Sequence, residues 1–222
     1  MKHYPTNEYH AYDTIVLANG AFPTHPSALA HIDRWINQPE QIMLACCDGA
    51  VNNLQSYTDL LPNIVVGDLD SVQPSLRERL GERVIHISEQ DTNDLTKTMH
   101  YVTQEIGKKR IVLLGITGKR DDHMLGNLVV LPHYAPWVDE LVIVTDTGYF
   151  RLIKEDASLE VEVGQGISIF SFEPKPISLI GLHWPLTDYV LPYLWSGTLN
   201  RADEKIITIK TKHPILVFVA NK

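Results

Sequence analysis

The chain has 222 residues, of which 44% are hydrophobic and 21% are charged. This length allows one large or two small domains with cores of their own, and the composition excludes a largely disordered chain, a collagen-like repeat and a coiled coil. The net charge is −8, from 19 Lys and Arg residues against 27 Asp and Glu residues. Because non-specific nucleic-acid binding needs a basic face, we expect no nucleic-acid partner.

The two cysteines, Cys46 and Cys47, are adjacent in an apolar run. Neighbouring thiols do not make a disulfide framework, and they suit a reducing compartment. The N-terminal residues are polar and lack the apolar core of a signal peptide, and no apolar run approaches the roughly 18 residues that a membrane span needs. We therefore expect a cytoplasmic protein with no membrane partner.

Strand-like and helix-like segments alternate over the first two thirds of the chain. The clearest helical segment covers residues 92–106, where Leu95, Met99, Val102 and Ile106 recur at spacings of 3 and 4 and share one face. This alternation predicts a Rossmann-like parallel sheet with helices, an α/β domain. The short apolar runs that predict its buried strands occupy residues 14–18, 42–46, 63–66, 83–87, 110–114 and 140–145.

The pattern changes after residue 147. Gly, Pro and Ser residues separate short runs of alternating polarity, and no long helical period occurs. Such a pattern is typical of a small all-β domain, either a sandwich or a barrel. We therefore predict an α/β domain over residues 1–146 and a β domain over residues 147–222.

The first candidate site residues follow two predicted strands, the place where α/β proteins bind ligands. Asp48 is either a ligand contact or part of a plain Asp-Gly turn in which Asn52 or Asn53 starts a helix. Asp68 and Asp70, two residues apart after the next strand, point to the same side and attract a cation such as Mg²⁺. The alternative is a polar turn in which Ser71 caps the following helix.

The clearest predicted helix opens with a third candidate group. Asp91 suits the N-cap position and Asp94 suits the first turn, where it interacts with the positive helix end. Capping explains both acids without any further role. It does not explain Lys97, which shares a face with Asp94 and places an amine beside the predicted carboxylates.

A fourth group follows residues 110–114. Two glycines precede Lys119 and Arg120, whose side chains can bind phosphate oxygens. Asp122 is either a metal ligand or a helix cap. His123 is more simply a helix-start residue than a proton carrier.

These groups together predict a site for chemistry at one edge of the sheet. Clustered acids hold Mg²⁺, and cations offset the charge of a phosphoryl or pyrophosphoryl group in transfer. The sequence has neither a P-loop nor a Gly-x-Gly-x-x-Gly motif, and no Cys/His spacing typical of zinc. The residues that meet at this edge are Asp68, Asp70, Asp94 and Asp122, with Lys97, Lys119 and Arg120 among them.

The order and spacing of these segments resemble the thiamine pyrophosphokinase (thiamine diphosphokinase) family. The resemblance covers nearly the whole chain after about residue 15. The matching blocks are Asp48-Gly49-Ala50-Val51-Asn52, Pro62-Asn63-Ile64-Val65-Val66-Gly67-Asp68-Leu69-Asp70-Ser71, Gln90-Asp91-Thr92-Asn93-Asp94-Leu95-Thr96-Lys97, Gly118-Lys119-Arg120-Asp121-Asp122-His123 with Asn127 following, Ile177-Ser178-Leu179-Ile180-Gly181-Leu182 and Trp195-Ser196-Gly197-Thr198-Leu199-Asn200.

The resemblance implies an α/β domain followed by a β-sandwich, and a homodimer that holds thiamine between domains of different subunits. The implied reaction transfers pyrophosphate from ATP to the thiamine hydroxyl, giving thiamine diphosphate and AMP, and we expect a Mg²⁺-assisted in-line attack. The implied catalytic residues are Asp70, Asp94, Lys97 and Arg120, with Asp70 or Asp94 assisting deprotonation. The implied metal ligands are Asp68, Asp70, Asp94 and Asp122. The implied ATP and phosphate contacts are Asp48, Asn52, Gln90, Lys97, Lys119 and Arg120. The implied thiamine contacts are Trp195, Ser196 and Asn200.

Three departures from the family pattern concern substrate binding. Ala50-Val51-Asn52 follows Gly49 where the family has Gly-Gly-Ala-Asn, Lys119 stands in place of a glycine, and Leu199 replaces a serine before Asn200. Two alternatives follow, a pyrophosphokinase acting on another hydroxymethyl heterocycle and a non-catalytic sensor of thiamine or nucleotide. A purely structural role leaves the acidic cluster unexplained.

Overall fold

The computed structural model describes residues 1–6 and 8–222, and the chain divides into two compact units. The α/β unit comprises Tyr12–Val130 and Pro136–Asp146, and the β unit comprises Met1–Ala11, Leu131–Ala135 and Thr147–Lys222. The chain therefore passes between units after residue 146, where we expected a boundary. The first residues of the chain, expected in the α/β domain, group with the β unit.

A parallel sheet forms the centre of the α/β unit. Its order is β7-β6-β2-β3-β4-β5, and every neighbouring pair is parallel. All residues of β2 and β7 are buried, as expected of strands covered on both faces. The strands are β2 (Thr14–Leu17), β3 (Met43–Cys47), β4 (Ile64–Gly67), β5 (Val84–His86), β6 (Arg110–Leu114) and β7 (Glu140–Thr145).

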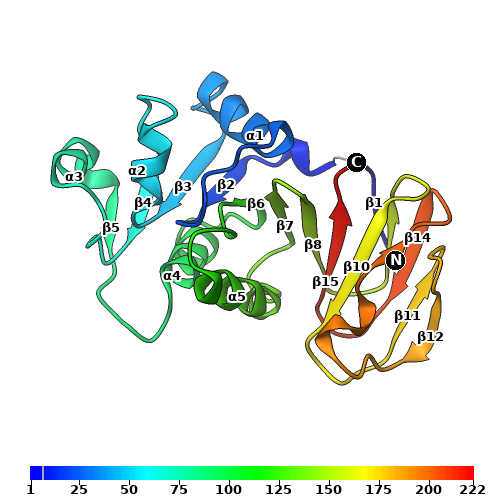
Figure 1. Ribbon diagram of the computed structural model, residues 1–222. Coiled ribbons are helices and arrows are strands. Elements are labelled where there is room, and N and C mark those ends of the chain that lie inside the picture. The colour runs from blue at the N-terminus through cyan, green and yellow to red at the C-terminus, as the bar shows by residue number, and fades with distance from the viewer. Residues whose placement is uncertain (7) are drawn as a thin grey trace. The chain divides into compact units, whose positions relative to one another are not determined.

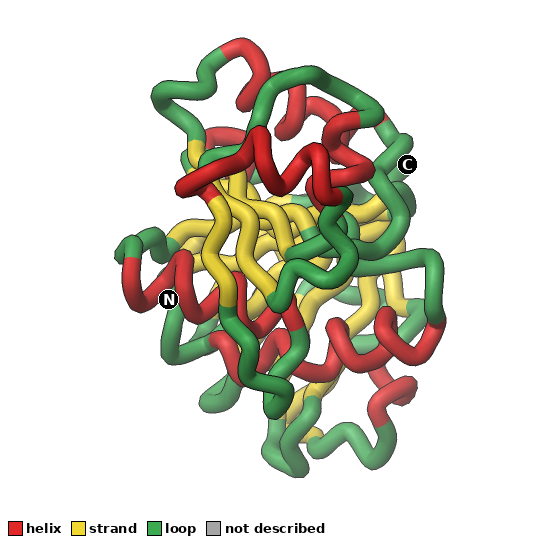
Figure 2. The backbone as a smooth tube through the Cα atoms, turned by 90° about the vertical axis from the view of Figure 1, so that its left-hand side faces the viewer, coloured by secondary structure: helices red, strands yellow, loops and turns green. Residues whose placement is uncertain are grey.

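Helices cover both faces of this sheet, and Figure 2 shows them above and below the strands of the α/β unit. In Figure 1, α1 and α2 lie on one side and α4 and α5 on the other. The direction of strand addition reverses at β2, and right-handed crossovers then place later helices on the opposite face. The helices are α1 (Pro26–Asn37), α2 (Ala50–Gln55), α3 (Pro74–Leu80), α4 (Asp94–His100) and α5 (Asp121–Val130). None of the helices in the described ranges is long and apolar enough to cross a membrane.

The helix predicted over residues 92–106 is shorter and less regular than expected. It comprises α4 and a π-helical turn, η3 (Tyr101–Glu105). The wider turn shifts the phase of the helical face, so Met99 and Val102 are fully buried whereas Ile106 is 40% exposed. The N-cap is Asn93, whose side chain accepts a hydrogen bond from the backbone N–H of Thr96, so the prediction of Asp91 as N-cap is wrong.

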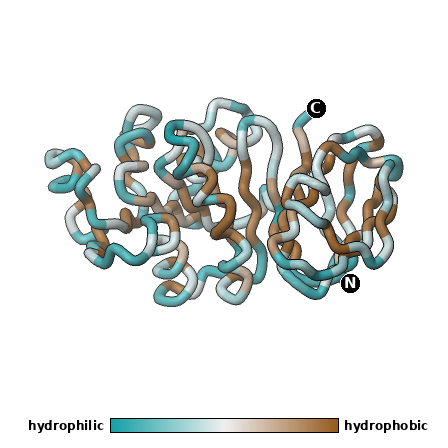
Figure 3. The backbone as a smooth tube through the Cα atoms, turned by 60° about the horizontal axis from the view of Figure 1, so that its bottom comes forward, coloured by the Kyte–Doolittle hydropathy of each residue, from teal (hydrophilic) through white to brown (hydrophobic). Residues whose placement is uncertain are grey.

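The β unit contains two sheets with a shared core, the predicted sandwich. One sheet has the order β13-β10-β15-β8 and the other β1-β9-β14-β11-β12, and each contributes buried side chains such as Ile169, Val217, Leu159 and Ile207. In Figure 3 these strands are largely hydrophobic and many of the connecting loops hydrophilic. The strands are β1 (Lys2–Tyr4), β8 (Gly148–Ile153), β9 (Ala157–Glu160), β10 (Gly166–Ser171), β11 (Ile177–Ile180), β12 (Leu186–Tyr189), β13 (Asn200–Arg201), β14 (Ile206–Lys210) and β15 (Ile215–Ala220).

Short helical turns also occur among the described residues. They are η1 (Glu8–Ala11), η2 (Gly81–Arg83), η4 (Leu131–Tyr134) and η5 (Leu194–Gly197). The β-unit pairs are antiparallel except β1 with β9, which is parallel. The N-terminal strand thus completes a sheet whose other members come from the last third of the chain.

Candidate active site

A cavity of about 630 Å³ lies at the carboxyl ends of β2, β3, β4 and β6 in the α/β unit. The strand order reverses at β2, and loops that diverge at such a point leave a crevice where α/β proteins bind ligands. The lining includes eight residues singled out from the sequence. They are Asp48, Asp68, Gln90, Asp94, Lys97, Lys119, Arg120 and Asp122.

Three carboxylates meet at the ends of β3 and β4. One oxygen from each of Asp48, Asp68 and Asp70 lies within 4.8 Å of the others. Asp48 is only 2% exposed, and its Oδ1 atom has no hydrogen-bond donor among the described residues. A buried carboxylate oxygen without a donor beside two further carboxylates fits a hard divalent cation. Asp68 and Asp70 were grouped from the sequence as metal ligands, and the structure places beside them Asp48, which the resemblance assigned to ATP and phosphate binding.

Close approach of the two strand ends brings these carboxylates together. A Cβ atom on Gly67 would lie 2.7 Å from the Asp48 Cβ, so only glycine fits at the end of β4. Leu69 has a φ of 68° and is buried, and this turn places Asp68 and Asp70 on either side of it. The backbone N–H of Asp70 donates to Asp68 Oδ1 at 3.3 Å.

Asp68 and Asp94 are affected in opposite ways by their surroundings. The side-chain amide of Gln90 donates to Asp68 Oδ2 at 3.2 Å and holds the pKa of Asp68 below its usual value. Burial and the nearby Asp48 carboxylate raise the pKa of Asp94. Asp94 is therefore the better proton acceptor of the two.

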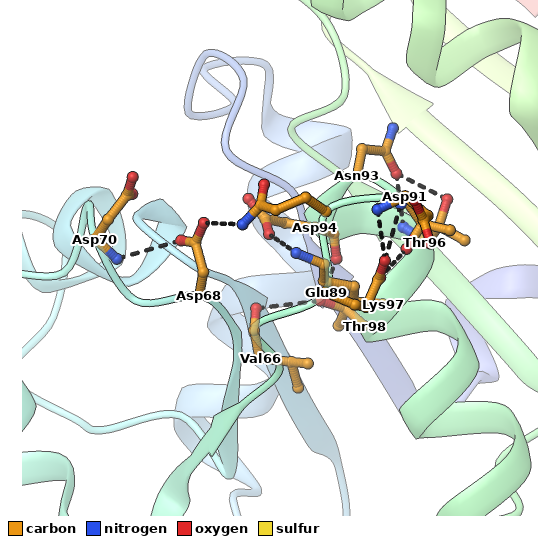
Figure 4. A network of polar contacts seen from close by, with 12 residues as sticks. Val66, Asp68, Asp70, Glu89, Asp91, Asn93, Asp94, Thr96, Lys97 and Thr98 are labelled. Atoms are coloured by element: carbon orange, nitrogen blue, oxygen red, sulfur yellow. Dashed lines mark hydrogen bonds and ion pairs between the residues drawn. The ribbon is translucent and has the colours of Figure 1, made fainter.

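Lys97 points toward the carboxylates from the first turns of α4. Its Nζ lies 3.5 Å from Asp94 Oδ1, and the Lys97 side chain is only 3% exposed (Figure 4). Asn93 fixes the start of the helix, and the Thr98 hydroxyl donates to the Asp94 carbonyl at 2.7 Å. A buried lysine needs such a partner because an unpaired ammonium is costly to desolvate.

Arg120 and Asp122 form an ion pair at the start of α5. Arg120 Nη2 and Nε lie 2.6 and 3.1 Å from the two carboxylate oxygens of Asp122. This contact lowers the pKa of Asp122 to about 2. The structure therefore places Asp122 at the cavity with Arg120 and apart from the three-carboxylate cluster.

Asn52 is not part of the cavity lining. Its side-chain amide donates to the Ser71 carbonyl at 2.7 Å, and its Oδ1 accepts from the backbone N–H of Gln73. These contacts hold α2 against the loop that precedes α3. The N-caps of α2 and α3 are Gly49 and Gln73, so neither Asn52 nor Ser71 has the capping role considered from the sequence.

The predicted thiamine contacts lie in the β unit, and the structure gives them different surroundings. Trp195 is 69% exposed and stacks on Tyr193 with a centroid distance of 5.6 Å. Asn200 is buried, and its amide donates to the Trp184 carbonyl and accepts from the Trp184 N–H, at 2.9 and 3.1 Å. Ser196, which follows Trp195 in the sequence, is half-buried. Asn200 thus fixes the backbone of Trp184, an exposed aromatic residue that was not among the predicted thiamine contacts.

Two family models match consecutive parts of the chain. Residues 37–138 match the catalytic domain of thiamin pyrophosphokinase, and residues 148–218 match its substrate-binding domain. The chain belongs to the thiamin pyrophosphokinase family. The carboxylate cluster lies in the region matched by the catalytic-domain model, as do the cavity cations Lys97, Lys119 and Arg120. The region matched by the substrate-binding model contains Trp184, Trp195 and Asn200.

Sequence relatives agree with this family, and two solved structures share the fold. Thiamine pyrophosphokinase 1 of Oryza sativa subsp. japonica is 28% identical over 202 residues, covering 77% of this chain and 76% of the relative. Thiamine pyrophosphokinase 2 of Arabidopsis thaliana is 26% identical over 208 residues, covering 80% and 77%. The thiamin pyrophosphokinase structure from Candida albicans has a TM-score of 0.76 at 19% identity, covering 100% of this chain and 93% of that one. The Bacillus subtilis structure has a TM-score of 0.72 at 21% identity, covering 94% and 99%.

One part of the cavity precedes the region of the family's catalytic match. Ala18, Asn19 and Gly20 follow β2 and line the cavity, and they were not singled out from the sequence. The signal was present, because a polar residue and a glycine directly follow a buried strand there, as at Asp48-Gly49.

Proposed function

We propose that this protein is a thiamine pyrophosphokinase, which transfers the pyrophosphoryl group of ATP to the thiamine hydroxyl and releases AMP. The observation that carries the proposal is the carboxylate cluster of Asp48, Asp68 and Asp70. Two of its members, Asp48 and Asp68, line one cavity together with cationic side chains. Pyrophosphoryl transfer needs a cation to neutralise polyphosphate charge and donors to stabilise the moving group.

The proposed cofactor is Mg²⁺, held by Asp48, Asp68 and Asp70. Mg²⁺ prefers carboxylate oxygens together with substrate phosphates, and when bound it neutralises phosphate charge. Gln90 orients Asp68 through its hydrogen bond, as outer partners of metal ligands commonly do. Asp94 and Asp122, also considered as ligands, have ion-pair partners of their own in Lys97 and Arg120.

The chain's own residues act on the hydroxyl and on the phosphates. Asp94 accepts the proton of the thiamine hydroxyl, whose oxygen forms a bond to the β-phosphorus as the bond to the α-phosphate oxygen breaks. Lys97 holds Asp94 in place and keeps positive charge close to the reacting phosphate. Arg120 is 70% exposed at the cavity and offers donors in a fixed fork to phosphate oxygens. Gln90 and Lys119 are further phosphate contacts in this proposal.

Thiamine binding is assigned to exposed rings of the β unit. Trp184 and Trp195 are 58% and 69% exposed, and aromatic faces suit a flat cationic ring. Asn200 contributes by fixing Trp184, because its amide is already engaged with backbone groups. Ser196 offers a hydroxyl beside Trp195.

We also propose a cytoplasmic homodimer with thiamine held between the α/β unit of one subunit and the β unit of its partner. Exposed apolar side chains gather in one stretch of the β unit, and such surfaces commonly mark interfaces. They are Trp184, Tyr189, Val190, Tyr193, Leu194, Trp195 and Leu199. Mixing inactive Asp68→Asn with Trp184→Ala, which should bind thiamine weakly, should restore the parent's thiamine affinity in heterodimers if sites are shared, and should restore none of it if each subunit is self-sufficient.

The deciding experiment is AMP formation from ATP and Mg²⁺, with and without thiamine. Thiamine-dependent AMP together with thiamine diphosphate is the expected result. A folded protein that makes no AMP with thiamine contradicts the proposal.

The exposed Leu199, at a position where the family has serine, favours one second candidate. That candidate is pyrophosphoryl transfer to another hydroxymethyl heterocycle, which a panel of such alcohols tests through AMP release. Binding of thiamine diphosphate without turnover of any alcohol would instead indicate a sensor.

A further inference from the structure

Three cationic side chains line the cavity, and one of them differs from the others in its partner. Lys97 and Arg120 each lie against a carboxylate. Lys119 Nζ instead donates to the side-chain carbonyl oxygen of Asn19 at 2.9 Å, and no carboxylate of the described residues forms an ion pair with it. A neutral acceptor leaves the full charge of the ammonium group and two of its N–H donors for an anion.

The backbone at Lys119 is held in an unfavourable conformation. Lys119 has a φ of 56° and follows Gly118, with a φ of 74°. The left-handed region is disfavoured for a residue with a Cβ, and a glycine would adopt it without strain. A strained non-glycine residue at a cavity indicates that its side chain has a role.

Asn19 is fixed in front of Lys119 by backbone contacts between two loops. The N–H groups of Ala18 and Gly20 donate to Leu114 and Gly115 carbonyls at 2.9 and 2.7 Å. A Cβ atom on Gly20 would lie 2.3 Å from the Gly115 carbonyl oxygen, and one on Gly49 would lie 2.8 Å from the Asn19 amide nitrogen. The loop after β2 is therefore held against the loop that carries Lys119, and the Asn19 amide has little freedom to turn.

We propose that Asn19 is a positioning residue that holds the Lys119 ammonium group at the cavity, and that the pair makes the site select nucleotides by their number of phosphates. The inference rests on the proposed nucleotide site but concerns a residue outside the family's catalytic match. An ammonium group without a carboxylate partner gains most from a polyphosphate, whose charge exceeds what the cluster-bound cation neutralises. AMP has a single phosphate and therefore offers the ammonium group less negative charge.

The test compares the affinity for ATP and for AMP, each with Mg²⁺, by calorimetry without thiamine. Lys119→Gly should weaken ATP binding roughly 10-fold or more and AMP binding by less than about 3-fold. Its melting temperature should stay equal or rise, because glycine suits the φ of 56°. Lys119→Gln, which keeps the side-chain length without the charge, should reproduce the loss of ATP affinity.

The role of Asn19 is read from a double-mutant cycle. Asn19→Leu, which removes the acceptor at similar size, should weaken ATP binding about 3-fold in the parent protein and have no effect in the Lys119→Gly background. Equal losses in both backgrounds would show that Asn19 does not act through Lys119. Equal losses for ATP and AMP in Lys119→Gly and Lys119→Gln would overturn the selection by phosphate number.

These outcomes are separable from the fate of the proposed reaction. If the parent protein binds ATP with the expected pattern but makes no AMP with thiamine, the reaction is wrong and the role of the pair is retained. If it makes AMP but the variants bind ATP like the parent, the proposed role of Asn19 and Lys119 is wrong and the proposed reaction is retained. If the parent binds no ATP, both are wrong.

Discussion

In the α/β unit, Asp68, Asp94 and Arg120 each have a polar side-chain partner, whereas in the β unit Trp184, Tyr193 and Trp195 expose more than half of their surface. The first arrangement is held in place before any ligand arrives, and it suits anions and a cation that demand fixed geometry. The second offers apolar area that gains its energy only when something covers it. The two units therefore differ in what a substitution should change, catalysis in one and affinity or stability in the other.

Asp68→Asn should have the largest effect. It removes one charge from the carboxylate cluster, so thiamine-dependent AMP formation should fall at least about 100-fold. The melting temperature should change little, because Asp68 is half-buried at a strand end and its loss relieves repulsion. Asp91→Asn, an exposed acid of the neighbouring loop that does not line the cavity, is the matched control and should retain activity. Full activity in Asp68→Asn would refute the cluster as the metal site.

Asn200→Ala should act mainly on the stability of the β unit. The change leaves the Trp184 carbonyl and the Trp184 and Arg201 N–H groups without their partner, which costs about 1–3 kcal/mol. Urea denaturation measures this loss of unfolding free energy. Leu199→Ala, at the neighbouring and 86% exposed position, should stay within about 0.5 kcal/mol of the parent. An unfolding free energy equal to that of the parent would contradict this role of the Asn200 amide.

Trp184→Ala and Trp195→Ala should raise the KM for thiamine by roughly 10-fold and leave the KM for ATP unchanged. Both rings are exposed, so most of their surface is available to contact thiamine. Unfolding free energies should shift by less than about 0.5 kcal/mol. Steady-state kinetics with each substrate varied in turn separates the two KM values. Phe variants at the same positions should recover most of the affinity. An unchanged thiamine KM in both Ala variants would remove these rings from the site.

The smallest expected effect is a pH dependence of stability in the β unit. His213 is 2% exposed and hydrogen-bonded to Ser171, and burial lowers its pKa below the usual 6.5, with Lys175 acting in the same direction and Glu173 opposing it. Below about pH 6.5 the unfolded chain binds a proton that the folded chain resists, so unfolding free energy should fall as the pH falls, by up to about 1.4 kcal/mol per unit. His213→Asn should flatten this slope between pH 5 and 7. An identical slope in the variant would assign it to other groups.

The strands of the α/β unit were predictable because each lies in a short apolar run, and all of them except β5 are mostly buried. The π-helical turn after α4 was not, because it depends on packing that the spacing of Leu95, Met99, Val102 and Ile106 does not show. The first residues of the chain were expected in the α/β domain but group with the β unit, which local sequence patterns also do not show. The pairing of β1 with β9 spans most of the chain, and local patterns carry no information on it.

The candidate site was predictable as a set of residues but not as a set of partners. Strand-end acids and cations identified the cavity, yet only the structure shows that Asp48 joins Asp68 and Asp70, and that Arg120 and Asp122 pair with each other. Asn200 illustrates the limit best. Its position suggests a ligand contact, while its buried amide is engaged with the backbone of Trp184.

The parallel pairing of β1 with β9 also constrains how the protein is made. Lys2 pairs with Ala157, so the ribosome must add about 155 residues between the two partners. At 5–20 residues per second, the N-terminal strand waits roughly 8–30 s for its place in the sheet. The sheet of the β unit therefore closes only near the end of synthesis. A fragment of residues 147–222 expressed alone should leave the β9 edge unpaired and aggregate unless a peptide carrying Lys2–Tyr4 is supplied.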